Sequence, residues 1–345
     1  MFKPDLFSTK SPVWRKMEKE KNHFFSPILR SIFKKLNLDE IEIEYSGALE
    51  INSSNYKIVF DKKKILLKRW DFNINEVEIK KIISLQLYLW RNIGLTAKPK
   101  KFLNNSYIYK NKNNIFTISE FVEGVYFQGS IPELKNSAIS IAKLTNILQE
   151  LPRSLYPSNG SEFNFQETKT VVKEIRKRKN EWQDIFGKGD NQLLRNNWDF
   201  IENALHLTKD FKLNFVDKQP IHFDLHPHNL LFNNKKISAF LDYDAIKNFN
   251  VFSALSFASL KLCRQSVSVN SLEDIQTIKN TFLNELKNHL YLKKDSFDDI
   301  YFYSTAEVLR RITIIFKLNL ENNKKWNRVL GMQLNHLKEA EILFG

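Results

Sequence analysis

The order of two side-chain periodicities along the chain constrains its fold most. From Ile41 apolar residues alternate with polar ones, as in half-buried strands, and strand patterns return at 56–60, 65–70, 106–109 and 115–121. A helical pattern covers 75–92, where Gly94 is placed to end it. Further helices are expected at 133–150, 166–186, 190–208, 251–263, 271–289, 297–318 and 325–343. Strands followed by helices predict an α+β fold of two lobes, a small antiparallel sheet and a larger helical part.

Three parts of the chain are expected from this order. Residues 1–40 mix basic and aromatic residues with an amphipathic pattern around Ile28 and Leu29, which predicts an N-terminal helical extension. Residues 41–124 should form the sheet lobe and the segment that connects it to the rest. Residues 125–345 should form the helical lobe.

Composition limits the class of protein. A chain of 345 residues with 42% hydrophobic residues can bury a large core and is not disordered. The single cysteine, Cys263, excludes an intrachain disulfide and fits a reducing compartment. Residues 1–12 lack the apolar segment of a signal peptide, and the apolar runs at 251–263 and 312–316 are too short to span a bilayer. We therefore expect a soluble, cytoplasmic protein without a membrane partner, and the oligomeric state stays open.

The net charge of +14 raises the question of a nucleic-acid partner. Basic runs such as 62–64 and 176–179 are scattered along the chain and carry no interleaved aromatic motif. Dispersed charge of this kind indicates a solvated surface. We therefore expect no specific nucleic-acid partner.

One segment, 221–244, interrupts the helices and carries the strongest chemical pattern. Asp224 and Asn229 stand five residues apart, and Asp242 follows Asn229 by thirteen. An aspartate beside a tight loop can accept a proton from a hydroxyl group. An asparagine and an aspartate facing each other across a short hairpin can hold magnesium on the phosphates of ATP. This spacing is typical of a kinase-type phosphotransferase.

The same segment also predicts a β-hairpin. Residues 230–232 and 237–241 have the composition of strands. A turn with positive φ angles is expected between them at Asn233-Asn234.

These residues resemble the catalytic segment of the aminoglycoside phosphotransferase and choline kinase family, whose usual pattern is His-Gly-Asp-Leu-His-x-x-Asn followed by Asp-Phe-Asp. The chain reads His-Phe-Asp-Leu-His-Pro-His-Asn over 222–229 and Asp-Tyr-Asp over 242–244. Phe223 departs from the family, in which glycine is common at this position, and changes the packing under the loop. Weaker similarity extends from about Tyr45 to the last helices. The resemblance implies a protein-kinase-like fold, with ATP bound by the sheet lobe and a hinge, and with the catalytic loop and substrate site in the helical lobe.

The resemblance also implies roles for residues of the catalytic segment. Asp224 is the expected catalytic base. The other residues hold metal or support the loop: Asn229 and Asp242 as magnesium ligands, His222 and His226 as braces, and Asp244 as a contact to a second ion or to the substrate.

Lys68 is the residue of the sheet lobe that the resemblance places on the ATP phosphates, with Arg69 as its nearest competitor. The family pairs this lysine with a glutamate of the following helix. Glu76 and Glu78 both qualify, and helical spacing does not choose between them, although Glu78 is slightly favoured.

Two further segments of the sheet lobe are implied to contact the nucleotide. The turn at 46–55 has a single glycine, and its backbone N–H groups and the Ser53 or Ser54 hydroxyls are candidates to face phosphate, although an ordinary hairpin loop fits equally well. The segment 117–124 resembles the family's linker between lobes. There the carbonyl of Glu120 and the amide of Val122 are the expected contacts to adenine.

The predicted function is transfer of the γ-phosphoryl group of ATP, with Mg²⁺ as cofactor, to a hydroxyl of a sugar, amino sugar or amino alcohol. A nucleotide-binding regulator without turnover and a protein-kinase-like enzyme remain alternatives, although no Ala-Pro-Glu landmark follows Asp242. A zinc hydrolase built on His222, His226 and His228 is a weaker alternative, because it leaves Asn229, Asp242 and Lys68 without a role.

Overall fold

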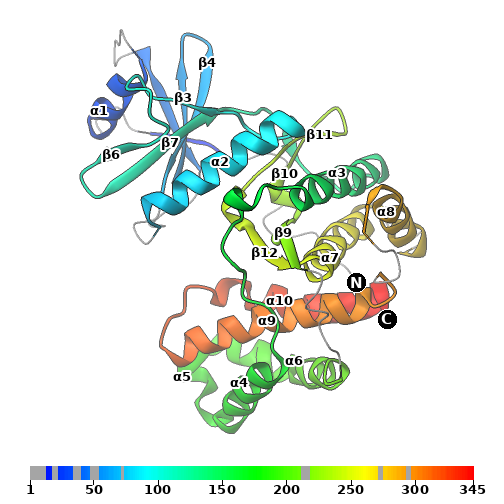
Figure 1. Ribbon diagram of the computed structural model, residues 1–345. Coiled ribbons are helices and arrows are strands. Elements are labelled where there is room, and N and C mark those ends of the chain that lie inside the picture. The colour runs from blue at the N-terminus through cyan, green and yellow to red at the C-terminus, as the bar shows by residue number, and fades with distance from the viewer. Residues whose placement is uncertain are drawn as a thin grey trace.

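An antiparallel sheet makes up the small lobe (Figure 1). The computed structural model describes residues 13–17, 22–33, 40–46, 54–70, 74–210, 218–270, 275–292 and 297–345. The strands of this sheet are β1 (Arg15–Lys16), β2 (Glu42–Ser46), β3 (Ser54–Phe60), β4 (Lys63–Arg69), β5 (Pro99–Lys100), β6 (Tyr109–Asn111) and β7 (Asn114–Glu120). Their order is β1-β2-β3-β4-β7-β5, and β6 also pairs with β7. The expected antiparallel start is confirmed, because β2, β3 and β4 pair in succession.

Alternation along these strands buries one face of the sheet. Tyr56, Ile58 and Leu67 are almost completely buried there. Helix α1 (Asn22–Ile32) adds Ile28 and Leu29 to the same apolar cluster. The described part of the N-terminal segment therefore packs on the sheet, and its strand β1 extends the sheet beyond β2.

Helix α2 (Glu76–Asn92) crosses the small lobe and matches the helix expected at 75–92. Asn75 caps its N-terminus, because the Asn75 side chain accepts a hydrogen bond from the N–H of Glu78. Gly94 follows its end with a φ angle of +70°, a conformation that glycine adopts without strain.

The large lobe consists mainly of helices. They are α3 (Ile131–Gln149), α4 (Phe165–Lys177), α5 (Trp182–Phe186), α6 (Lys188–Leu207), α7 (Val251–Val269), α8 (Ile275–His289), α9 (Ile300–Leu320) and α10 (Leu330–Phe344), with short 3₁₀ turns η3 (Arg153–Leu155), η4 (Lys179–Glu181) and η9 (Asn327–Val329). In Figure 1, α4, α5, α6, α9 and α10 lie at the end of the molecule away from the sheet. Helix α7 packs between α8, α9 and α10, and nearly all of its side chains are buried.

Two helical expectations need correction. The helix expected at 166–186 is broken between α4 and α5, because Trp182 turns back into the core and donates its indole N–H to the carbonyl of Ile175 over 2.7 Å. Helix α7 continues six residues beyond 263, where its apolar pattern ends. The first four residues of the extension, 264–267, are buried, and Arg264 forms an ion pair there with Glu339 of α10.

Small strands join the lobes beneath the sheet. β8 (Val125–Tyr126) pairs with β10 (Leu230–Asn233), which pairs with β11 (Lys236–Phe240), and β9 (Lys218–His222) pairs with β12 (Ile246–Asn250). The hairpin turn lies one residue later than expected, since Asn234 and Lys235 have positive φ while Asn233 still pairs with Lys236. Within the described ranges, no helix is long and apolar enough to cross a membrane.

Candidate active site

Buried contacts hold the predicted catalytic loop in place. β9 ends at His222, and the chain then passes through Asp224 into η6 (Pro227–Asn229). His222 is fully buried, its Nε2 donates to the carbonyl oxygen of Leu241 over 2.8 Å, and its Nδ1 accepts from the N–H of Asp224 over 3.4 Å. Burial lowers the pKa of His222, which keeps the ring neutral and able to make both bonds. His222 thus ties the loop to the end of β11.

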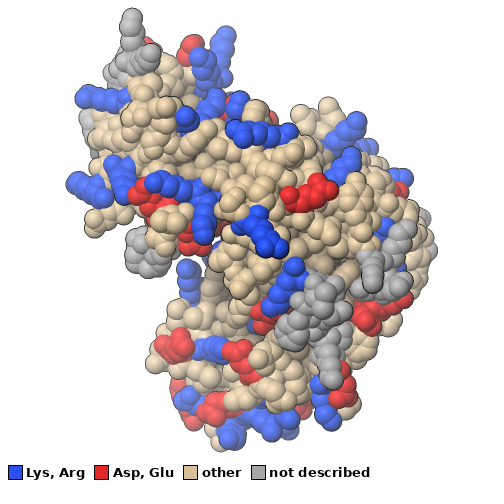
Figure 2. Space-filling view, in the orientation of Figure 1, with Lys and Arg blue, Asp and Glu red and all other residues tan. Residues whose placement is uncertain are grey.

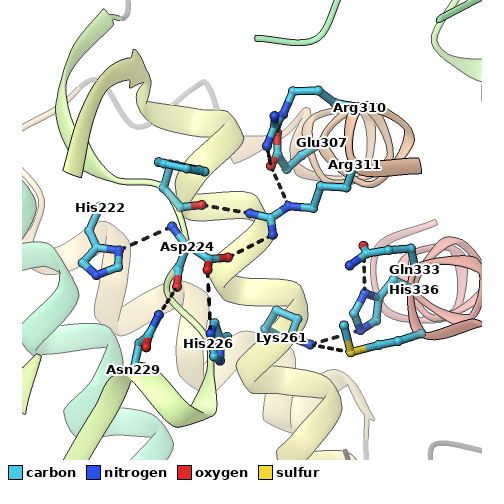
Figure 3. Close-up of polar contacts among 12 residues, drawn as sticks. His222, Asp224, His226, Asn229, Lys261, Glu307, Arg310, Arg311, Gln333 and His336 are labelled. Atoms are coloured by element: carbon cyan, nitrogen blue, oxygen red, sulfur yellow. Dashed lines mark hydrogen bonds and ion pairs between the residues drawn. The ribbon is translucent and has the colours of Figure 1, made fainter. Parts of the chain in front are cut away.

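The carboxylate of Asp224 lies against Arg311 of α9 (Figure 3). Nη1 of Arg311 donates to Oδ1 of Asp224 over 2.9 Å, and Nε2 of His226 lies 3.8 Å from Oδ2. Burial alone would raise the pKa of Asp224, but the charge of Arg311, the neighbouring His226 and the hydrogen bond from Arg311 together outweigh burial and hold that pKa well below its usual range. Asp224 is therefore ionised at neutral pH and can act as a hydrogen-bond acceptor.

Phe223, the departure from the family pattern, connects the loop to α9. Its ring centroid lies 5.6 Å from that of Phe249, and the Arg310 guanidinium lies 5.9 Å from the Phe223 ring. The carbonyl oxygen of Phe223 accepts a hydrogen bond of 3.2 Å from Nη2 of Arg311. Its φ angle is not positive, so the backbone does not require glycine here.

A cavity of about 410 Å³ lies between the lobes beside this loop. Strands β4 and β7, the segment after β7 and the inner face of α2 line it from the small lobe. The large lobe contributes Asn229, Asp242 and Asp244, and Lys68 of β4 also lines the cavity. The structure therefore brings together four site residues that are far apart in the sequence.

Lys68 meets both aspartates of the Asp-Tyr-Asp segment. Its Nζ lies 2.7 Å from Oδ1 of Asp244 and 3.8 Å from Oδ1 of Asp242, and it sits 4.1 Å from the ring centroid of Trp70. Burial would lower the pKa of Lys68, but Asp244 and then Asp242 raise it, so the ammonium group stays charged. Burial and the neighbouring Asp244 raise the pKa of Asp242. Asp242 is thus the carboxylate of this pair that would gain most from an added cation.

The expected pairing of Lys68 with Glu78 is wrong. Glu78 lies 3.5 Å from Lys247 of β12, and Glu76 pairs with Lys80 and Lys110. Helix α2 presents Ile82, Ile83 and Gln86 to the cavity. Both acidic residues of α2 lie in its first turn, outside this stripe, so the partners of Lys68 come from the large lobe instead.

Oxygen donors for a hard cation converge at the same end of the cavity. Nδ2 of Asn229 donates to the carbonyl oxygen of Asp224 over 2.9 Å, so its side-chain oxygen Oδ1 is the atom left for a cation. Asn229 and Asp242 both line the cavity, and amide and carboxylate oxygens suit magnesium bound to phosphate. The donor set fits Mg²⁺.

The histidine cluster does not form a zinc site. Both ring nitrogens of His222 are engaged, and Nδ1 of His226 accepts from the N–H of His228 over 3.3 Å. Across the part of the chain that the structure describes, no three His, Cys, Asp or Glu side chains are grouped to hold a metal ion.

The connecting segment after β7 forms one wall of the cavity, where Glu120, Phe121 and Val122 line it. Glu120 donates its N–H to the carbonyl of Lys98 over 2.9 Å. The Val122 N–H has no main-chain acceptor among the described residues, which leaves it available to a ligand. Gly124 allows close packing, because a Cβ atom there would lie 3.0 Å from the carbonyl oxygen of Phe232.

The two serines expected near phosphate cannot be placed. Ser53 lies outside the described residues, and Ser54 begins β3 with a side chain that is also outside the description. Ser46 and Asn55, which flank the undescribed turn, do line the cavity. Arg69, the alternative to Lys68, does not line it.

Sequence reasoning missed Arg311, which is the closest charged partner of Asp224. Arg311 also donates through Nε to Oε1 of Glu307, and Arg310 pairs with both oxygens of Glu307. The available signal was Glu307, Arg310 and Arg311, which are the three charged residues of the mainly apolar stretch 300–316 in the helix expected at 297–318. Charged side chains in a buried helix require partners of opposite charge, and Asp224 is the partner of Arg311.

Solved structures share this architecture. Amicoumacin kinase, solved with AMP-PNP, Ca²⁺ and Ami, superposes with a TM-score of 0.61 at 13% identity, over 94% of this chain and 96% of that one. Spectinomycin phosphotransferase, solved with ADP and spectinomycin, gives 0.59 at 13% identity over 88% and 92%. Choline kinase from Cryptosporidium parvum gives 0.54 at 13% identity over 93% and 95%. At these identities the similarity establishes the fold, which is the two-lobed protein-kinase-like fold predicted from the sequence.

Sequence comparison identifies the family. No curated protein matches the chain significantly. A model of the phosphotransferase enzyme family matches residues 51–248, which is more than half of the chain. This match includes Lys68, the connecting segment and the whole catalytic segment, and the chain therefore belongs to the phosphotransferase enzyme family.

Proposed function

We propose that this phosphotransferase moves the γ-phosphoryl group of ATP to a hydroxyl of a small metabolite. The observation that carries the proposal is the cavity between the lobes, where Lys68, Asn229 and Asp242 face one space. Asp224 adjoins this space, because its carbonyl oxygen is bound by Asn229. Phosphoryl transfer requires a cationic side chain that binds phosphate, oxygen atoms that bind a metal ion, and a carboxylate that accepts a hydrogen bond from the attacking hydroxyl.

The nucleotide would lie with adenine against the connecting segment and its phosphates near Lys68. The carbonyl of Glu120 and the N–H of Val122 would bind the base edge, and the apolar side chains of Leu66, Ile118 and Leu231 in the cavity lining would contact its faces. Lys68 would hold the phosphates from the opposite end. The same ammonium group pairs with Asp244, which keeps it directed into the cavity.

Asn229 and Asp242 would hold magnesium, and Asp244 would support this site. The ion would neutralise charge on the β- and γ-phosphates. Asp242 is suited to this role because burial and Asp244 already disfavour its charge without a cation. Structures with AMP-PNP and Ca²⁺ or with ADP are known for the two similar phosphotransferases, which supports nucleotide and divalent-cation binding here.

Asp224 would orient the acceptor hydroxyl and receive its proton. Its low pKa makes it a weak base but a permanently charged hydrogen-bond acceptor. A loose transition state needs little deprotonation of the nucleophile before phosphoryl transfer, so alignment by Asp224 supplies most of what is required. His222 and Arg311 hold the loop and the carboxylate in position for this task.

An ATP-dependent assay on a panel of hydroxyl compounds tests the proposal. The panel should include sugars, amino sugars and amino alcohols, with ADP release and a phosphorylated product both measured. Turnover of one compound supports the small-molecule phosphotransferase. Nucleotide binding without any product would point to a regulator, and phosphorylation of proteins alone would point to a protein-kinase-like enzyme.

A further inference from the structure

Charged residues of three helices gather on the side of Asp224 where Arg311 lies (Figure 3). We call these residues the charged wall: Lys261 and Arg264 of α7, Glu307, Arg310 and Arg311 of α9, and His336 and Glu339 of α10. Figure 3 shows Lys261, Glu307, Arg310, Arg311 and His336 grouped beside Asp224 and His226. The wall holds four cationic and two anionic side chains.

Both carboxylates of the charged wall are already bound by arginines. Glu307 receives bonds of 2.7 and 2.6 Å from Arg310 and a bond of 2.8 Å from Arg311. Glu339 receives bonds of 2.6 and 3.0 Å from Arg264. Bidentate arginine–carboxylate pairs in a buried setting are strong and costly to separate. Neither carboxylate is therefore available to an ammonium group on a substrate.

The aromatic faces near Asp224 are occupied in the same way. The Arg311 guanidinium lies 3.7 Å from the ring centroid of Phe257. The Arg310 guanidinium lies 5.9 Å from the ring of Phe223 and 5.6 Å from that of Phe249. A substrate cation is bound in proteins by carboxylates or by aromatic faces. At this wall the chain's own arginines take both kinds of group.

Arg311 is the member of the charged wall that an acceptor can reach. Its side chain is 18% exposed, next to Asp224 at 28% and His226 at 26%, whereas Lys261, Arg264, Glu307 and His336 are buried. The bonds to Asp224, Phe223 and Glu307 use three of its five N–H groups. Its position is fixed by these bonds and by Phe257. An acceptor bound at Asp224 thus meets a rigid guanidinium with donors to spare.

We infer that the acceptor carries an anionic group, a carboxylate or a phosphate, next to the hydroxyl that is phosphorylated, and that Arg311 is a specificity-determining residue for it. This inference rests on the proposed phosphotransfer and narrows its acceptor from sugars and amino alcohols in general to their acidic counterparts. Apart from Asp224, which binds the reacting hydroxyl, a cationic acceptor would meet Arg311 and the buried cations of the charged wall, and both carboxylates of that wall are already bound by arginines. This arrangement is a repulsive element in its specificity. An anionic group on the acceptor would form a hydrogen bond with Arg311. The positive charge of Arg311 would then offset the negative charge that the acceptor brings toward ATP.

Acceptors of equal skeleton and different charge provide the test. Glycerate, glycerol and aminopropanediol share one carbon skeleton, as do gluconate, glucitol and glucamine, and glycerol phosphate separates phosphate from carboxylate recognition. We expect kcat/KM for the best acidic compound to exceed that of its amine counterpart at least about tenfold, which corresponds to ~1.4 kcal/mol. Equal or higher kcat/KM for the amine would overturn the inference while leaving the phosphotransferase in place.

Variants assign the selectivity to Arg311. Arg311→Gln should reduce the ratio of kcat/KM between acidic and neutral acceptors at least about tenfold, because one charge-assisted hydrogen bond is lost. The matched control is Lys317→Gln on the same helix, which removes one positive charge from an exposed ion pair with Glu167 and should leave the ratio unchanged. An equal fall of kcat/KM for all acceptors in Arg311→Gln would show that Arg311 serves catalysis alone and would overturn its specificity role.

Thermal stability in AMP-PNP and Mg²⁺ provides a readout that does not need turnover. The acidic compounds should raise the melting temperature of the nucleotide-bound wild type but not that of Arg311→Gln, and AMP-PNP itself should stabilise both if both are folded. Stabilisation by amines alone contradicts the inference. If AMP-PNP binds and no compound of any charge is phosphorylated, the proposed phosphotransfer fails, and the acceptor class falls with it.

Discussion

Arg311 donates a hydrogen bond of 2.9 Å to Asp224, although 87 residues separate them in the sequence. The contact places a permanent cation beside the carboxylate that we propose to receive the acceptor hydroxyl. Arg311 reaches it from α9 while it also stacks on Phe257. The ionisation of Asp224 therefore depends on α9, which lies far outside the catalytic segment in the sequence.

The pH profile should report this dependence. Without the Arg311 charge, burial raises the pKa of Asp224, and the carboxylate becomes protonated at a higher pH than in the wild type. Because the proposed role of Asp224 requires its ionised form, the acid limb of the kcat/KM profile should move to higher pH in Arg311→Gln. Lys317→Gln should keep the wild-type limb, and the same limb in both variants would contradict the role given to Arg311.

Removing the Asp224 carboxylate should affect catalysis far more than nucleotide binding. Asp224→Ala should lower kcat by about 10²–10⁴, because the acceptor hydroxyl loses both its alignment and its proton acceptor. The affinity for AMP-PNP should change little, since Asp224 does not line the cavity between the lobes where we propose that the nucleotide binds. Asp199→Ala, an exposed site on α6, serves as the control. Near-normal turnover of a folded Asp224→Ala protein would rule out the assignment.

Replacing Lys68 should mainly lower kcat/KM for ATP. Lys68→Met should lower kcat/KM for ATP about 10- to 100-fold, the effect of losing a charge-assisted hydrogen bond of about 1.5–3 kcal/mol. The comparison is Lys63→Met, an exposed lysine at the start of the same strand. The variant also leaves Asp244 without its cation, so a melting curve should accompany the kinetics. If both variants show the same kcat/KM, Lys68 does not bind phosphate.

Nucleotide and magnesium should stabilise the protein together. ATP with Mg²⁺ should add about 2.7 kcal/mol to the free energy of unfolding at a hundredfold excess over Kd, and chelation of the metal should reverse most of this gain. Asp242→Asn should weaken the magnesium-dependent part, because it removes the anionic donor. Stoichiometric zinc in the purified protein, with no response to ATP, would favour the hydrolase alternative.

We predict that the protein has no specific nucleic-acid partner, although its net charge is positive. On the face shown in Figure 2, lysines and arginines are spread over both lobes with acidic residues among them. Binding to DNA or RNA should therefore be weak, independent of sequence and steeply reduced by salt. Titrations at physiological salt check this. Submicromolar affinity for one defined sequence, well above that for unrelated sequences, would contradict it.

Local patterns predicted the fold well because most of its elements follow a strict periodicity. The alternation from Ile41 and the stripe of Ile79 and Ile83 each describe a surface that is buried on one side. The break before Trp182 could not be predicted, because it depends on where that indole packs in the assembled core. The extension of α7 beyond Cys263 was missed for a related reason. An arginine is normally exposed, and Arg264 is buried only because it forms an ion pair with Glu339 of a distant helix.

The site was predictable where its residues are close in sequence. Asp224, Asn229 and Asp242 lie within one short segment, so their spacing describes their geometry. The partner of Lys68 was predicted wrongly because both candidate glutamates lie off the inner stripe of α2, and helical periodicity alone cannot show where that stripe faces. Arg311 was missed because its contact to Asp224 spans two distant elements, and no local pattern reports such a contact.

The pairing of Lys68 with Asp244 has a consequence for how the molecule can be divided. The lysine belongs to the small lobe, but the carboxylates that hold it belong to the large one, and α2 offers no acidic side chain on the face toward the cavity. The small lobe is therefore not a portable nucleotide-binding module. Cut at Gly124 and grafted elsewhere, it would carry an ammonium group with the Trp70 ring beside it but no carboxylate to direct it, so the two lobes must be exchanged or redesigned as one unit.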